Sequence, residues 1–410
     1  MLTLPVLLTL ILSGPGFAVS GDLYADREEG NLAFDGGAAG VAAVEKRTPA
    51  AADKNRLLSE LKVRIVFEGD KHGEAAFNGL LSEALDSPSA RESAGEFLKS
   101  NARVRVSFAK LSGSLVRSEG KEFVAGQHAY TYMDETPPRV ALNELLAGHD
   151  RGAAITTLTH EMFGHSVEAV RLSAREKEFN DLALDEEENA RLIGWLSAAE
   201  LGYEPGDDAW AYLQDPEEEM RSIRRNGYAA RLTREEMRDP LPAYRERLAE
   251  LDREAEKAEQ KLAKCAKWAS FIDHLVAVHK MEESSFEYLR GEISSVRRML
   301  PDYRAGILKD RADLKARLER LSGGGSGLGK LRDRISGYNG GEFINELSMR
   351  ADDEYFKRRE EKIRERRARL MALLAGKKQA SPPPPPAGQI SFEELKLLLT
   401  ADAVSCPAGK

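Results

Sequence analysis

The feature that most constrains the fold of this 410-residue chain is a long, regular spacing of apolar residues in its second half. Between residues 241 and 276, apolar or small residues recur at alternating intervals of three and four, with charged residues between them. A second such stretch covers residues 287–321 and contains Pro301, which we expect to kink or break the helix. This spacing places one apolar stripe along a helix, and the stripe needs a partner helix. We therefore predict an antiparallel, coiled-coil-like helical hairpin over residues 236–321.

The start of the chain has the pattern of a secretory signal peptide. Its apolar run ends by about Ser13, too short for the roughly 20 residues that cross a bilayer as a helix. Small residues at positions 18–20 then resemble a cleavage site. We predict that residues 1–20 are removed and that the protein is exported, to the periplasm or the extracellular space. Residues 21–55 are predicted to form a disordered mature N-terminus, and no later segment is apolar enough to span a membrane.

Charge and cysteine content limit the function classes. The net charge of −8 argues against a general nucleic-acid binder, which usually carries a basic surface. The only cysteines, Cys265 and Cys406, allow one disulfide but neither a disulfide scaffold nor a cysteine zinc cluster. A metal site in this chain must therefore use His, Asp or Glu.

A mixed pattern of strands and helices covers residues 56–235. Alternating apolar residues predict five strands, and apolar residues at helical spacing predict helices before, between and after them. The strands are expected at residues 63–67, 104–108, 122–124, 128–133 and 139–142, and the helices at 56–61, 74–101, 153–175 and 182–232. The predicted fold class is therefore α+β, with a mostly helical second half.

The last segments have simpler compositions. Residues 322–375 are predicted to form a Gly-rich linker and a charged helix, whose charge runs at 353–368 we interpret as solvated faces. Residues 376–410 are predicted to form a Pro-rich spacer and a short C-terminal helix.

The segment that carries chemistry lies at residues 160–165, with the sequence His-Glu-Met-Phe-Gly-His. Neutral imidazoles are good zinc ligands, and a neighbouring glutamate can take a proton from a zinc-bound water. His160 and His165 are therefore candidate ligands of Zn²⁺, and Glu161 is the candidate general base. In a regular helix, residues five apart differ by roughly 140° around the axis, too far for one tetrahedral ion. We predict that a π-bulge absorbs the extra residue, with the distortion cheapest at Gly164.

This six-residue motif is similar to the H-E-x-x-G-H zinc motif of the dipeptidyl peptidase III family. The resemblance implies that both histidines bind zinc and that a downstream acidic motif supplies a glutamate as the third ligand. More broadly, strands followed by such a helix look like the zincin fold, so residues 56–235 are predicted to form a zincin-like domain. In zincins the strand at the sheet edge binds an extended peptide, and residues 128–134 and 139–143 are candidates for that edge.

Three consecutive glutamates are candidates for the third ligand. Glu187 lies 22 residues after His165, a separation similar to that in thermolysin-like peptidases, and a Glu followed three residues later by Ala also matches them. Glu188 and Glu186 face other sides of the same helix and are the alternates. An ordinary acidic helix start, favoured by the helix dipole, would explain the same run.

These observations predict an exported zinc metallopeptidase that hydrolyses peptide bonds with water activated by zinc and Glu161. The partners would be peptide or protein substrates, with self-association or a partner protein at the helical arm. Two alternatives remain open. One is a non-catalytic zincin-like protein whose arm mediates assembly or partner binding, and the other is a zinc amidase acting on a non-protein amide.

Overall fold

The computed structural model describes residues 51–100, 103–111, 113–118, 121–132, 135–172, 179–204, 206–225, 227–322 and 340–375. The chain divides into two compact units. Among the described residues, the sheet unit comprises 51–216 and 352–375, and the hairpin unit comprises 217–351. The hairpin unit is thus an insertion in the sequence of the sheet unit, and the division falls at Glu217 rather than at the expected residue 235. The predicted signal peptide, Gly-rich linker, Pro-rich spacer and C-terminal helix lie outside the described residues.

The sheet unit contains a small mixed sheet among many helices, in agreement with the predicted α+β class. Its four strands lie in the order β1-β2-β6-β5, with three parallel strands and an antiparallel strand at the β5 edge. Two further strands form a separate antiparallel hairpin. The bounds are β1 (Ile65–Phe67), β2 (Val104–Ala109), β3 (Gly113–Ser118), β4 (Lys121–Gly126), β5 (Ala129–Tyr132) and β6 (Arg139–Asn143). The five predicted strands are confirmed, and β3 was missed.

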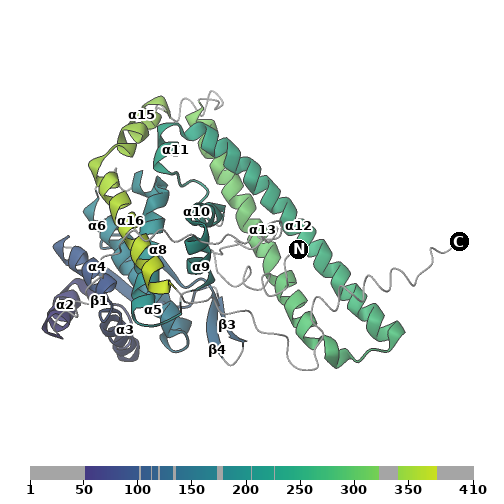
Figure 1. The fold of residues 1–410 in the computed structure, drawn as a ribbon. Coiled ribbons are helices and arrows are strands. Elements are labelled where there is room, and N and C mark those ends of the chain that lie inside the picture. Colours follow the sequence, from purple (N-terminus) through teal and green to yellow (C-terminus); the bar gives the residue numbers. More distant parts are fainter. Residues whose placement is uncertain are drawn as a thin grey trace. The chain divides into compact units, whose positions relative to one another are not determined.

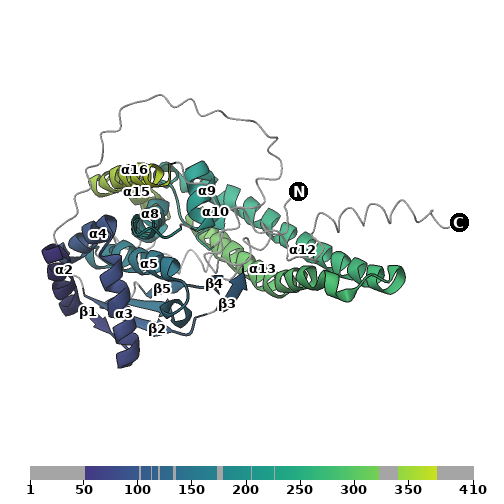
Figure 2. The ribbon, with the colours of Figure 1, turned by 60° about the horizontal axis from the view of Figure 1, so that its bottom comes forward.

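Helices make up most of the rest of the sheet unit (Figures 1 and 2). They are α2 (Ala51–Arg64), α3 (Lys71–Ala84), α4 (Pro88–Lys99), η2 (Glu144–Ala147), α5 (Arg151–Thr159), η3 (His160–His165), α6 (Ser166–Arg171), α8 (Leu184–Glu200), α9 (Asp207–Gln214) and α16 (Glu354–Leu374). Ser87 caps α4, and Pro88 follows at its first turn, which splits the helix predicted over 74–101. Helix α2 begins at Ala51, so the final residues of the segment predicted as disordered are helical.

One feature of the sheet unit contradicts the sequence prediction. The charged helix α16 packs along α8, as Figure 1 shows. Arg359 and Arg366 are each only 4% exposed, so the interpretation of residues 353–368 as solvated faces is wrong for these two side chains. Apolar residues of α16 recur at intervals of seven on the same buried side, at Phe356, Ile363 and Leu370.

The hairpin unit is built from helices, namely α10 (Pro216–Arg225), α11 (Arg234–Arg238), α12 (Pro240–His279), η4 (Glu283–Phe286), α13 (Glu287–Leu321) and α15 (Gly340–Ala351). The two long helices α12 and α13 lie side by side (Figure 1). Ion pairs of Arg304 with Glu259 and of Arg311 with Asp252 show that they run antiparallel, as predicted. Helix α13 continues through Pro301, so the chain does not break there, which was one of the two expected outcomes of this proline.

The predicted apolar seam forms the core of this hairpin. Its buried members include Ala258, Ile272, Ile293 and Val296, and the free thiol of Cys265 is buried among them. Cys406 lies outside the described residues. In the part of the chain that the structure describes, no helix combines the length and the apolar composition needed to cross a membrane.

Candidate metal centre

The motif at residues 160–165 lies in a π-helical segment. Helix α5 leads into η3, which has π geometry over His160–His165, and α6 follows without interruption. The wider turn brings the two histidines to one face, with ring centroids 4.6 Å apart and planes nearly perpendicular at 87°. The predicted π-bulge is therefore confirmed, and it solves the spacing problem that five residues pose in a regular helix.

Two glycines let this segment touch α8. A Cβ atom added at Gly164 would meet Ala190 Cβ at 2.5 Å and Ala190 Cα at 2.8 Å. A Cβ atom added at Gly194, on α8 itself, would meet the Thr156 carbonyl oxygen at 2.7 Å. Gly164 is thus explained by a close approach of two helices, in addition to the helical distortion that the sequence suggested. This approach brings the acidic start of α8 up to the histidines.

The three candidate glutamates of α8 have three different surroundings. Glu187 places Oε2 3.4 Å from His165 Nε2 and Oε1 3.9 Å from His160 Nε2. Glu186 accepts a hydrogen bond from His165 Nδ1 at 2.5 Å. Glu188 accepts hydrogen bonds from Tyr212 and Arg367 instead. The structure therefore brings Glu187 to the two imidazoles, and Glu186 behind one of them.

Hydrogen bonding fixes how His165 presents its lone pair. Because a carboxylate only accepts, the bond to Glu186 places the proton on His165 Nδ1. The other nitrogen, Nε2, lies 3.0 Å from His160 Nε2 and faces Glu187 Oε2. Three electron-rich atoms thus converge on one point, and such an arrangement requires a cation among them, either a proton or a metal ion. A carboxylate behind a ligating histidine is the usual way to set its tautomer and orientation.

The pKa shifts of the cluster agree with a cation held between its imidazoles and carboxylates. Burial lowers the pKa of His160 to about 3, with help from the neighbouring His165. Burial also opposes protonation of His165, but the carboxylates of Glu186 and Glu187 outweigh it and raise its pKa well above the usual value. For Glu187, burial favours the neutral acid, yet Arg191 and the two histidines hold its pKa well below the usual range. Arg191 donates a hydrogen bond to Glu187 Oε1 at 2.7 Å, so the Glu187 carboxylate is paired with a guanidinium of its own helix.

These atoms suit a zinc ion. Zn²⁺ binds nitrogen and oxygen at about 2.0–2.2 Å, which separates two ligands of a tetrahedral ion by about 3.3 Å. The distances of 3.0 Å between the two Nε2 atoms and 3.4 Å from His165 Nε2 to Glu187 Oε2 lie close to that value, and the third pair, His160 Nε2 and Glu187 Oε1, is wider at 3.9 Å. Two imidazoles and one carboxylate are also a ligand set that catalytic zinc sites use.

Glu161 lies beside the same cluster. It is 8% exposed, and burial raises its pKa, while His165 and Thr131 act in the opposite direction. Its Oε1 atom is 4.0 Å from His160 Nε2, and its Oε2 atom accepts a hydrogen bond from the Thr131 hydroxyl of β5. The arrangement supplies a buried carboxylate next to the convergence point, as a general base for a metal-bound water requires.

Hydrogen bonds from α16, which the sequence did not predict, hold the helices of the site together. Arg359 donates to Asp185 at 2.8 Å and to Glu168 at 3.4 Å, and it also donates to Asn180. Asp185 precedes the two site glutamates on α8, and Glu168 lies one turn after His165 on α6, so one buried guanidinium joins both helices that carry the site. The available signal was the position of Arg359 between Phe356 and Ile363, within the buried stripe of its helix.

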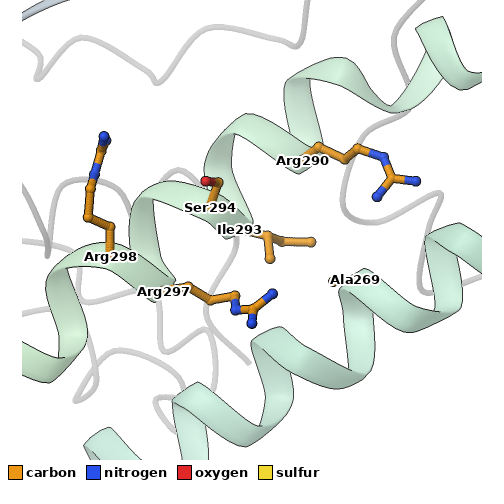
Figure 3. Close-up of a pocket in the computed structure, with 6 residues that line it drawn as sticks. All are labelled: Ala269, Arg290, Ile293, Ser294, Arg297 and Arg298. Atoms are coloured by element: carbon orange, nitrogen blue, oxygen red, sulfur yellow. The ribbon is translucent and has the colours of Figure 1, made fainter.

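A surface pocket in the hairpin unit has a different character. Figure 3 shows its lining residues, Ala269, Arg290, Ile293, Ser294, Arg297 and Arg298. None of these six carries a carboxylate, imidazole or thiol. Arg290 is already paired with Asp273 and Glu283. The pocket therefore lacks the groups that a metal centre or acid–base chemistry needs, whereas the cluster on η3 and α8 has them.

Comparisons with models of protein families, with curated proteins and with solved structures find no match to this chain. The functional assignment therefore depends on the geometry and chemistry of the cluster itself. Its residues are supplied by η3, α8 and β5, which all belong to the sheet unit.

Proposed function

We propose that this protein is a zinc-dependent metallopeptidase, with His160, His165 and Glu187 as the zinc ligands and Glu161 as the general base. The observation that carries the proposal is the convergence of two Nε2 atoms and one carboxylate oxygen at 3.0 and 3.4 Å, on a π-helical turn. A zinc ion in such a site supplies a water of lowered pKa and a Lewis acid for a carbonyl oxygen.

The residues of the chain have separate tasks in this proposal. Glu161 accepts a proton from the attacking water at Oε1, the atom that faces the histidines, and then delivers a proton to the leaving amine. Glu186 keeps the His165 imidazole in the tautomer whose Nε2 can bind metal. Arg191 holds the Glu187 carboxylate in its ionised form.

The sheet offers a binding mode for an extended peptide. Strand β5 is the terminal strand next to the site, and it is the one antiparallel member of the four-stranded sheet. An extended peptide can add to such an edge by backbone hydrogen bonds, with its scissile bond beside Glu161. The sheet edge and the ligand cluster together favour a peptide over a small, compact substrate.

The proposal is tested with the zinc-loaded protein and a library of unstructured peptides, with fragments identified by mass spectrometry. Wild-type protein should cleave a subset of the library. Glu161→Gln should reduce cleavage by a factor of about 100 or more, because it keeps the ligands and loses the base. Glu144→Gln changes an exposed glutamate of η2 and should leave cleavage unchanged. Equal cleavage by wild-type protein and Glu161→Gln would contradict the mechanism, and zinc binding without cleavage of any peptide would contradict the substrate class.

A further inference from the structure

One residue outside the histidine–glutamate cluster contacts the proposed base. Thr131 is the third residue of β5 and pairs with Val140 of β6. Side chains alternate along a strand, so Tyr130 and Tyr132 share one face, where their ring centroids are 4.7 Å apart. Thr131 projects from the opposite face, toward η3, and Figure 2 shows β5 running beneath the helix layer that contains α5.

The two oxygens of the Glu161 carboxylate face two different residues. The Thr131 hydroxyl donates this hydrogen bond and the Glu161 carboxylate accepts it. It occupies Oε2, while Oε1 lies 4.0 Å from His160 Nε2. A glutamate side chain has three rotatable bonds, and a tether on one oxygen restricts where the other can lie. The hydroxyl thus holds the reactive oxygen toward the ligands.

We propose that Thr131 is a positioning residue for Glu161. Strand β5 then both binds the peptide at the sheet edge and orients the general base. This inference rests on the proposed function. A peptide paired along β5 takes its position from the backbone of that strand, and Glu161 takes its orientation from a side chain of the same strand. The distance between the scissile carbonyl and Oε1 is thereby fixed by a single element, which is the condition for efficient proton transfer.

The first test compares Thr131→Val, which has nearly the same shape but no donor, with Thr131→Ser, which keeps the donor. We expect Thr131→Val to lower kcat for a cleaved peptide by about 10- to 100-fold with little change in KM, because substrate pairing uses the backbone. Thr131→Ser should recover most of kcat. Bound zinc should be the same in all three proteins, since Thr131 is not a ligand.

A second test needs no catalysis and separates this inference from the proposed function. The urea midpoint of the metal-free protein is measured for Thr131→Val in two backgrounds, wild type and Glu161→Met. The valine should lower the midpoint in the wild-type background, where it leaves a buried carboxylate without its donor. It should have little effect in the Glu161→Met background, where no carboxylate remains to be tethered. The two substitutions are then coupled, and equal midpoint shifts in both backgrounds would overturn the tether between Thr131 and Glu161.

The outcomes are distinguishable. If wild-type protein cleaves peptides and Thr131→Val cleaves them equally well, the positioning role is wrong while the proposed function stands. If wild-type protein cleaves nothing, the proposed function fails and the positioning role fails with it, whereas the coupled midpoints still decide whether the tether exists. The inference predicts a lower kcat for Thr131→Val, a kcat close to that of the wild type for Thr131→Ser, and coupled midpoints.

Discussion

The apolar seam of the hairpin unit and the histidine–glutamate cluster of the sheet unit differ in how they use charged residues. Along the seam, the long helices pack apolar side chains against each other and place ion pairs outside, as with Arg304 and Glu259, which are 40% and 70% exposed, although Arg247 and Glu292 of the same helices are buried. In the sheet unit, ionised groups lie inside, and Glu187 and Arg359 have side chains that are 0% and 3% exposed. Exposed pairs contribute little to stability, whereas buried charges are costly unless each has its partner. The difference indicates that apolar packing joins the two long helices, whereas paired charges are held in fixed positions around the cluster of the sheet unit.

The largest expected effect is the loss of stability on substitution of Arg359 in α16, compared with substitution of its neighbour Arg358. Arg359→Gln should lower the free energy of unfolding by about 3–5 kcal/mol, because it removes the buried cation that Asp185 and Glu168 share. Arg358→Gln should change it by less than about 1 kcal/mol, since the pair of Arg358 with Glu354 is exposed at 72% and 69%. Urea denaturation of both variants checks this. Equal losses of unfolding free energy in the two variants would contradict the expected difference between a buried and an exposed ion pair.

A second comparison uses glycines from the two units. Gly164→Ala should destabilise the protein by about 1–3 kcal/mol and weaken zinc binding, because the added methyl group meets the backbone of Ala190. Gly291→Ala, in α13, has no atom within 4 Å of the added methyl group and should stabilise the protein by about 0.5–1 kcal/mol. Thermal unfolding and zinc titration measure both. A neutral Gly164→Ala would mean that η3 and α8 can separate without loss.

A smaller effect should appear as a pH dependence in the hairpin unit. Burial raises the pKa of Glu292 to about 7, compared with about 4.5 in an unfolded chain. Between these values the unfolded chain loses the proton while the folded chain keeps it, so this group lowers stability progressively as the pH rises from 4.5 to 7. Glu292→Gln should therefore stabilise the protein at pH 8 by an amount on the order of 1 kcal/mol and have little effect at pH 4.

The matched control for this effect is Glu259→Gln, which changes a 70% exposed carboxylate on α12. Its effect on stability should be small at both pH values, and urea denaturation at pH 4 and pH 8 measures both variants. A gain for Glu292→Gln that is the same at pH 4 and pH 8 would show that ionisation of Glu292 is not its cause.

The sequence predicted the hairpin more completely than the site, and the reason is physical. The seam is a local signal, because each apolar position predicts the next by helical geometry, and burial follows for Ala258, Ile272 and Val296. The π-bulge was predictable for the same reason, since two histidines five residues apart on one helix require it to share an ion.

The remaining features of the site depend on contacts between distant segments. Consecutive residues of a helix point about 100° apart, so the choice among Glu186, Glu187 and Glu188 depends on how α8 is rotated against η3. Glycine contacts with Ala190 and Thr156 set that rotation, and no spacing in the sequence encodes them. The bond from Arg359 to Asp185 spans 174 residues, and a run of charges predicts a solvated surface unless its partner is known.

The central claim is that His160, His165 and Glu187 bind zinc, and the most direct test is the zinc content of purified protein after reconstitution. Wild-type protein and Glu161→Gln should each hold about one zinc ion per chain, because the base is not a ligand. His165→Ala should hold none. His279→Ala alters the other histidine pair spaced by five, in the hairpin unit, and should keep the ion. Wild-type protein without zinc, or His165→Ala with a full complement, would contradict the account.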